Sequence, residues 1–215
     1  MCAESVRKAR CVVEAQGGKR LKKVLILNGV GTSGKGEFAS RLAKYVPTIK
    51  YSIIDIVKEA ADVLRWQGGK TEKDRKFLSD LLDLATEYND SPYKDVASLV
   101  DAFKNELPEE VLIIDMREPK DIARAAKDFG AETILIRNPN VKKIESNHAD
   151  RDVENYDYDY IIENNGTLEQ LNDVVKNFVD YIKGSSSNIL PSGAYCVFNP
   201  KGKMTMVFDC NKMLR

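Results

Sequence analysis

The sequence contains little histidine and cysteine, and these low counts exclude several functional classes. One histidine, His148, occurs in 215 residues. A single histidine excludes metal sites built from several histidines and H-E-x-x-H hydrolases, and it leaves a Ser-His-Asp triad no base except His148. The four cysteines, Cys2, Cys11, Cys196 and Cys210, form no C-x-x-C pair, so a disulfide framework is not expected.

An excess of either charge and a long apolar run are also missing. Lys and Arg total 33 and Asp and Glu total 33, which argues against binding to nucleic acid or anionic membrane through bulk charge. No apolar run approaches the ~20 residues that a membrane span requires. The N-terminal segment shows no apolar core of a signal peptide. We therefore expect a cytoplasmic protein with no nucleic-acid or membrane partner.

What is present is a regular alternation of short apolar strands and helical segments. Strands are predicted at 24–28, 48–54, 111–115, 133–137 and 158–163. Continuous apolar runs of this length are typical of strands that are buried on both faces of a parallel sheet. The sequence therefore predicts an α/β fold with three layers, α/β/α, around a mainly parallel five-stranded sheet.

The chain is expected to have three parts. Residues 22–183 are predicted to form the α/β domain, residues 1–21 an N-terminal extension, and residues 184–215 a linker with a β-hairpin tail. The linker is rich in Gly and Ser, and the apolar runs 195–198 and 204–208 flank a turn. The hairpin could pair with the sheet of a second copy, which would make a homo-oligomer, or it could extend its own sheet.

Capping residues predict where four of the helices begin. Asp55 stands at an expected N-cap, and Ser91 is an expected N-cap followed by proline at the first helical position. Thr71 lies three residues before an aspartate, and Thr167 begins a capping box.

A glycine-rich loop between the first strand and the first helix carries the strongest functional motif. Its sequence, GVGTSGKG, fits G-x-x-x-x-G-K, in which backbone N–H groups point at phosphate oxygens and the helix adds its positive end. Lys35 would place a compact cation on the β- and γ-phosphates. The alternative is a glycine-rich turn that binds nothing, but the strand before it and the helix after it favour a phosphate loop. The residues expected to bind the nucleotide are Gly29, Val30, Gly31, Thr32, Ser33, Gly34, Lys35, Gly36 and Glu37.

Gly36 departs from the motif, which has Ser or Thr at this position to coordinate Mg²⁺. Glycine offers no side-chain oxygen, so the metal would depend on phosphates, water and another carboxylate. Asp115 is the candidate, because it ends the third strand where the sheet opens into the same crevice as the loop. The alternative is an aspartate that only caps a turn. Arg117 points the same way and could clamp a phosphate, or it could form a surface ion pair.

Further basic residues are candidates for phosphate contacts. Arg75 could reach an acceptor phosphate, although a charged helix start is more often a solvated face. Polar residues 138–156 suit a lid that closes over phosphates and excludes water. Arg137 and Arg151, around this segment, are candidates for stabilising a transferring phosphoryl group, with plain surface positions as the alternative. His148 would serve as a hydrogen-bonding residue of the lid.

With these motifs in place, the chain resembles the P-loop nucleoside monophosphate kinase group, which is adenylate-kinase-like. It is most similar to the phage-type deoxynucleoside monophosphate kinases. The resemblance covers residues 22–183 and depends on LILNGVGTSGKGEF, YSIIDIVKEA, RKFLSDLLDL to YND, and IIDMREPKDI followed by ILIRN, SNHAD and DYIIENNGTLEQL. That family tolerates a residue other than Ser or Thr after the loop lysine, usually an aspartate.

The resemblance implies transfer of the γ-phosphoryl group of ATP, with Mg²⁺, to a (deoxy)nucleoside monophosphate. It implies that Asp55, Lys58 and Arg75 face the acceptor, that Arg117, Arg137 and Arg151 stabilise the transferring group, and that residues 164–167 lie near the adenine. Two other functions stay open. One is a kinase for another small phosphomonoester such as phosphomevalonate, and the other is a non-catalytic ATP-binding regulatory module.

Overall fold

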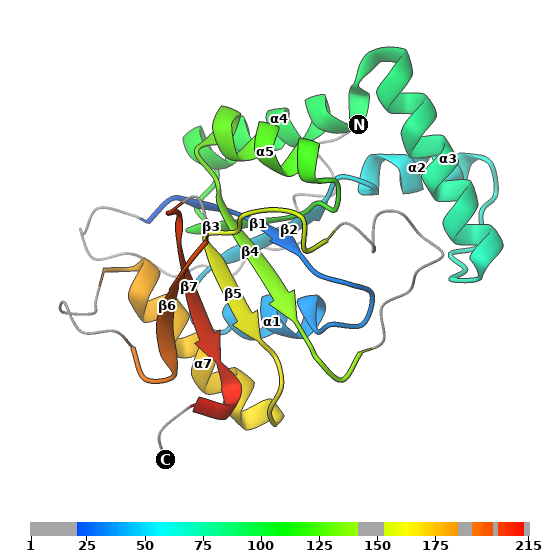
Figure 1. Ribbon diagram of the computed structural model, residues 1–215. Coiled ribbons are helices and arrows are strands. Elements are labelled where there is room, and N and C mark those ends of the chain that lie inside the picture. Colours follow the sequence, from blue (N-terminus) through cyan, green and yellow to red (C-terminus); the bar gives the residue numbers. More distant parts are fainter. Residues whose placement is uncertain (1–20, 142–152, 185–190, 200–201, 213–215) are drawn as a thin grey trace.

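The computed structural model describes residues 21–141, 153–184, 191–199 and 202–212 (Figure 1). Its strands are β1 Lys23–Asn28, β2 Thr48–Ser52, β3 Val111–Asp115, β4 Glu132–Arg137, β5 Tyr160–Glu163, β6 Ala194–Phe198 and β7 Met204–Asp209. Its α-helices are α1 Lys35–Leu42, α2 Asp55–Val63, α3 Glu72–Asn89, α4 Ser91–Asn105, α5 Pro119–Phe129 and α7 Leu168–Ile182. A 3₁₀ turn, η2, spans Cys210–Lys212.

The strands form one sheet in the order β2-β3-β1-β4-β5-β7-β6. Every neighbouring pair is parallel except β6 and β7, which are antiparallel. The α/β fold with a mainly parallel sheet is therefore confirmed. The predicted number of strands was too low, because the sheet contains seven.

The two additional strands come from the C-terminal hairpin, which is not an appendage to the sheet. β7 lies parallel to β5, with Tyr160 beside Met206 and Ile162 beside Phe208. Of the two arrangements that the sequence left open, the hairpin extends its own sheet. β6 then becomes the edge strand, and pairing of this edge with a second copy stays a prediction.

Helices cover both faces of the sheet, as the three-layer prediction expected (Figure 1). On one face, α1 and α7 pack on the strands through residues such as Phe38, Leu42 and Phe178. On the other face, α4 and α5 bury side chains that include Phe103 and Ile122. Alternate residues of each strand serve the two faces, which explains the continuous apolar runs.

The helices α2 and α3 form a separate lobe to one side of these layers (Figure 1). They pack on each other around a small cluster of Val57, Ala61 and Leu78. The lobe follows β2 in the chain. Two of its apolar residues are largely exposed, Val63 at 83% and Tyr88 at 84%. The described residues include no helix that is long and apolar enough to cross a membrane.

The capping predictions hold at two helices and shift by one residue at two others. Both Thr71 and Thr167 make complete capping boxes. Asp55 is the first residue of α2, and it is not the N-cap; its side chain accepts a hydrogen bond from the Ser52 N–H, 2.9 Å away, and so ties the helix to the end of β2. For α4 the N-cap is Asp90, in a left-handed conformation at φ 58°, and Ser91 is already helical.

Candidate phosphate-binding site

The loop between β1 and α1 has the backbone geometry of a tight turn that only glycine accepts at its critical positions. Gly34, the N-cap of α1, has φ 105°, and an added Cβ there would overlap the side-chain amide of Asn164. Gly29 has φ 150°, and a Cβ there would collide with the carbonyl of Ile136 on β4. Glycines at these positions allow the loop to approach its neighbours closely.

Asn28, at the end of β1, anchors the entry to the loop. It is fully buried, and its Oδ1 accepts from the Gly29 N–H at 2.8 Å. Its Nδ2 donates to the Tyr158 hydroxyl at 2.7 Å and to the Arg117 carbonyl at 3.2 Å. Burial raises the pKa of Tyr158, so this hydroxyl stays protonated and donates to the Val153 carbonyl, 2.7 Å away. One amide therefore connects the segments after β1, after β3 and before β5.

A second amide holds the other end of the loop. Asn164, which follows β5, donates from Nδ2 to the Ser33 carbonyl at 2.9 Å. The resemblance placed residues 164–167 near an adenine. The structure places Asn164 against the phosphate loop itself, where it fixes the backbone in front of α1.

The loop borders an open cavity of about 350 Å³. The lining consists of six residues from the loop and the start of α1, together with three from other elements: Gly31, Thr32, Ser33, Gly34, Lys35 and Gly36, and Lys50, Asp115 and Arg117. The N-terminus of α1 opens into it, so the first helical N–H groups and the positive end of the helix dipole favour an anion here.

Lys35 lies over the loop, within this cavity. Its ammonium donates to the carbonyl of Val30 at 2.9 Å and to the carbonyl of Gly29. These carbonyls hold the cation at the centre of the loop, where it can exchange carbonyl oxygens for phosphate oxygens when an anion enters.

Asp115 ends β3 on the opposite side of the cavity. Its Oδ2 pairs with the ammonium of Lys50 at 3.0 Å. Its Oδ1 is buried and has no hydrogen-bond partner among the described residues, and the same is true of the Ser33 Oγ. A buried polar atom without a partner costs roughly 1–3 kcal/mol, so a ligand that bonded to either atom would remove this cost.

These residues fit a bound Mg²⁺ with few protein ligands. Carboxylate oxygen is the ligand type that Mg²⁺ prefers, and the ion commonly keeps several waters. The Asp115 carboxylate, which belongs to the cavity lining, is therefore the group that would hold it, while Gly36 contributes no side-chain oxygen. No group of three or more His, Cys, Asp or Glu side chains that could hold a metal occurs in the part of the chain that is described, so a metal here would depend on water and phosphate.

Several predicted site residues lie away from this cavity. Glu37 forms an ion pair along α1 with Arg41, at 2.8 Å. Lys58 pairs with Asp55 at 2.7 Å at the start of α2. Arg75 is exposed on α3, in the helical lobe. Asp55, Lys58 and Arg75 therefore lie on α2 and α3, and none of them is among the residues that line the cavity beside the loop.

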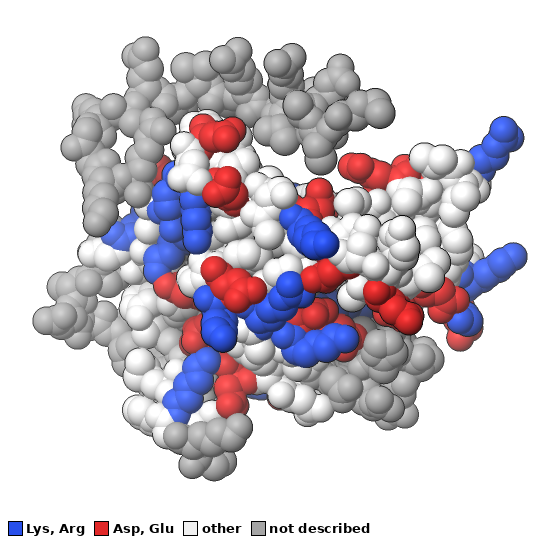
Figure 2. Space-filling view, turned by 90° about the horizontal axis from the view of Figure 1, so that it is seen from above, with Lys and Arg blue, Asp and Glu red and all other residues white. Residues whose placement is uncertain are grey.

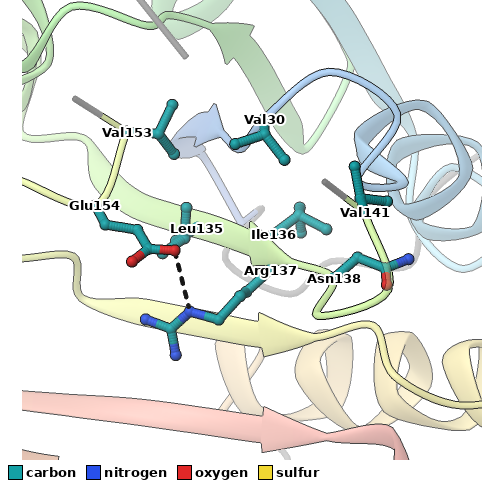
Figure 3. Close-up of a pocket in the computed structure, with 8 residues that line it drawn as sticks. All are labelled: Val30, Leu135, Ile136, Arg137, Asn138, Val141, Val153 and Glu154. Carbon is teal, nitrogen blue, oxygen red and sulfur yellow. Dashed lines mark ion pairs between the residues drawn. The ribbon is translucent and has the colours of Figure 1, made fainter. Parts of the chain in front are cut away.

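Arg137, at the end of β4, also lies outside the lining of the phosphate cavity. It borders a smaller pocket of about 40 Å³, together with Val30 of the loop (Figure 3). Its guanidinium pairs with Glu163 at 2.7 Å and with Glu154 at 3.9 Å, which is the contact drawn in Figure 3. Arg151 and His148 lie outside the described residues.

The structure thus places three of the predicted site residues, Lys35, Asp115 and Arg117, in the lining of one cavity. It adds Lys50, which the sequence analysis did not select. The available signal was a lysine within a predicted strand, 48–54, which is a weak indication without the sheet order.

On the surface as a whole, acidic and basic side chains are mixed. Figure 2 shows Lys and Arg beside Asp and Glu across the described part of the face seen from above. This agrees with the equal totals of the two charges in the sequence. The three basic residues that line the cavity beside the loop, Lys35, Lys50 and Arg117, are therefore a local concentration of positive charge.

No family model and no curated protein matches the sequence. Solved structures with a related arrangement include shikimate kinase from Aquifex aeolicus, which is 13% identical, with 75% of this chain and 97% of that chain covered and a TM-score of 0.41. A sugar kinase from Janibacter sp. is 13% identical, with 78% and 99% covered and a TM-score of 0.46. The APS kinase CysC of Mycobacterium tuberculosis is 13% identical, with 77% and 99% covered and a TM-score of 0.36.

These similarities are too distant to support an argument about activity.

Proposed function

We propose that the protein is an ATP-dependent phosphotransferase. The observation that supports this most strongly is that the loop backbone, Lys35, Asp115 and Arg117 line one cavity at the carboxyl end of the parallel sheet. In open α/β sheets this crevice is where ligands bind. A glycine loop, a helix N-terminus and fixed cations are the elements that phosphoryl transfer requires.

Each group has a defined part in this proposal. The loop N–H groups and the start of α1 would bind the donor phosphates, and Lys35 would move from the Val30 carbonyl to a phosphate oxygen. Arg117 offers a planar fork that can bind two phosphate oxygens. Mg²⁺, when bound beside Asp115, would neutralise part of the phosphate charge.

For the acceptor we propose a (deoxy)nucleoside monophosphate. Its phosphate oxygen is ionised at neutral pH, so the reaction needs no protein base, which suits a chain with one histidine. The motif resemblance supports this acceptor class, and the α2–α3 lobe carries the residues proposed to face it, Asp55, Lys58 and Arg75. Phosphomevalonate has the same reactive group and is the competing acceptor.

A second candidate, a non-catalytic ATP-binding module, is favoured by the metal site. Gly36 lacks the hydroxyl that the motif normally provides, and Lys50 already neutralises one oxygen of Asp115. Such a module would bind ATP and leave it intact when acceptors are present.

A screen of ADP formation would test the proposal. The protein is incubated with ATP, Mg²⁺ and each common nucleoside monophosphate in turn, with phosphomevalonate as the alternative acceptor. We expect acceptor-dependent ADP release with one or a few monophosphates. Release with phosphomevalonate alone would refute the nucleotide assignment, and ATP binding without ADP release would support the regulatory module.

A melting experiment supplies the binding control. ATP at about 100 times its Kd should add about 2.7 kcal/mol to the free energy of unfolding. A melting temperature that does not respond to ATP at any concentration would contradict both candidates.

A further inference from the structure

Lys50 reaches the phosphate cavity from the edge strand β2. In the register of β2 and β3, Lys50 lies beside Ile113, and Ser52 lies beside Asp115. Residues two apart on a strand share a face of the sheet. Asp115 is two residues beyond Ile113, so Lys50 and Asp115 lie on the same face of the sheet. The lysine side chain runs toward the carboxyl end, where its ammonium meets Asp115 Oδ2 at 3.0 Å.

This ammonium is available to a ligand as well as to the carboxylate. The Lys50 side chain is 42% exposed, and the residue is part of the lining of the cavity beside the loop. An ammonium has three donors, so a contact with Asp115 leaves donors that can bind a phosphate oxygen. The flexible four-carbon stem lets the charge move over a short range.

The two oxygens of Asp115 are in different situations. Oδ2 is paired with Lys50, while Oδ1 is buried without a hydrogen-bond partner among the described residues. A divalent cation bound to this carboxylate would lie close to the Lys50 ammonium, and like charges so close repel each other. The carboxylate can thus be neutralised by the lysine or by the metal, and each weakens the hold of the other.

The remaining lining strengthens this competition. Gly36 gives the metal no oxygen, so its protein contact is the carboxylate that Lys50 already holds. The cavity is lined by three cationic side chains, Lys35, Lys50 and Arg117, against one carboxylate. This surplus of positive charge suits the phosphates of a nucleotide even without a metal.

We propose that Lys50 is a second phosphate-binding lysine that takes over part of the role of the divalent cation and competes with Mg²⁺ for Asp115. The inference rests on the proposed function, because it assumes that the cavity binds ATP. In the absence of metal, Lys50 neutralises Asp115 and contacts the phosphates. When Mg²⁺ is present, the metal neutralises Asp115 and the lysine contributes less.

Isothermal titration calorimetry of ATP binding tests this in two buffers, one with excess EDTA and one with saturating Mg²⁺. In EDTA, Lys50→Met should weaken ATP binding by about tenfold or more, because it removes a charge-assisted contact and leaves Asp115 unneutralised near the phosphates. In Mg²⁺ the same variant should lose less than about threefold, because the metal replaces the missing charge. Lys50→Arg should keep most of the binding in EDTA.

The matched control is Lys44→Met, which removes the same charge from an exposed residue after α1. It should bind ATP like the wild type in both buffers. A Lys50→Met variant that loses affinity equally in both buffers, or in neither, overturns the role of Lys50 and leaves the proposed function in place. A wild type that binds no ATP in either buffer overturns both.

A metal titration gives a second readout. The affinity for ATP is measured at increasing Mg²⁺ concentrations. The Mg²⁺ concentration at the midpoint of the change in affinity should fall several-fold in Lys50→Met, because Asp115 no longer has a competing cation. An increase in that concentration would show that the lysine holds Asp115 in place for the metal, which is the opposite of the proposal.

Discussion

Two glycines of the phosphate loop, Gly34 and Gly36, should respond in opposite ways to the same substitution. Gly34 has φ 105°, and a non-glycine residue held in an unfavourable backbone region costs of order 1–3 kcal/mol. A methyl group there would also overlap the Asn164 Nδ2. The amide would have to move away and give up its 2.9 Å hydrogen bond to the Ser33 carbonyl, which costs about another 1 kcal/mol.

Gly36 is the matched control, because it lies in α1 and a Cβ there meets nothing within 4 Å. We expect Gly34→Ala to lower the free energy of unfolding by about 2–4 kcal/mol. Gly36→Ala should raise it by about 0.5–1 kcal/mol, because alanine is favoured over glycine in a helix. For a chain of this size, each kcal/mol shifts the melting temperature by about 2–4 °C.

Urea unfolding monitored by circular dichroism measures both variants, and ATP titration of the same samples shows whether the loop still binds. Gly34→Ala should also bind ATP more weakly, because the displaced Asn164 no longer fixes the loop. The reasoning would be refuted by a Gly34→Ala variant as stable as the wild type, or by equal losses in the two variants.

Further predictions concern the lysine, the metal, a buried thiol and the hairpin. Lys35→Met should lower kcat in the ADP-release assay by about 100-fold or more without a large change in melting temperature, and an unchanged rate would remove Lys35 from the mechanism. Gly36→Ser should lower the Mg²⁺ concentration needed for half-maximal ATP binding, and an unaltered magnesium titration would mean that the metal is held adequately elsewhere. Burial raises the pKa of the Cys210 thiol to about 11, from about 9. The folded protein then keeps a proton that the unfolded chain loses, so stability should fall as pH rises through this range. In urea unfolding at pH values from about 8 to about 10.5, Cys210→Val should lose less stability than the wild type, and identical pH curves would contradict the shift. A chain ending at residue 184 lacks the buried side chains of β7, of which Phe208 is fully buried. At about 1.5–3 kcal/mol for each buried side chain, this loss is comparable with the 5–15 kcal/mol that stabilises a typical domain. The shortened chain should show no cooperative melting, and a cooperative transition would mean that β7 is dispensable.

The elements of the central sheet could be predicted because their signals are local. Continuous apolar runs such as 24–28 and 111–115 became strands within about a residue of the expected bounds. Two capping boxes positioned α3 and α7. The place of the hairpin could not be predicted in the same way, since the pairing of β7 with β5 depends on residues more than forty positions apart. Nothing in the local sequence distinguishes an edge that extends its own sheet from one that pairs with a second copy.

In the candidate site, too, the residues with a local sequence signal could be predicted, and those that depend on strand pairing could not. The loop and Lys35 are contiguous in sequence, and Asp115 ends a strand that was recognisable from its apolar run and that pairs with β1. Lys50 was missed because its relevance appears only when β2 is known to pair with β3, which brings its ammonium to Asp115. Arg137 illustrates the reverse case. Its place beside the expected lid, residues 138–156, suggested a phosphate contact, and in the structure Glu163 and Glu154 pair with its guanidinium.

Gly36, which departs from the usual phosphate-loop motif, and Lys50, which pairs with Asp115, have a physical connection through that carboxylate. A metal held by both a hydroxyl at position 36 and the carboxylate would place a double positive charge beside Lys50, and the repulsion would oppose a lysine there. With glycine at position 36, the metal loses one ligand, and a cation supplied by the chain can share the carboxylate. The two residues should therefore be coupled. Adding the hydroxyl with Gly36→Ser and removing the lysine with Lys50→Met should each strengthen the binding of Mg²⁺. In the double variant, the change in the free energy of Mg²⁺ binding should differ from the sum of the changes in the two single variants, since both substitutions act through the same carboxylate.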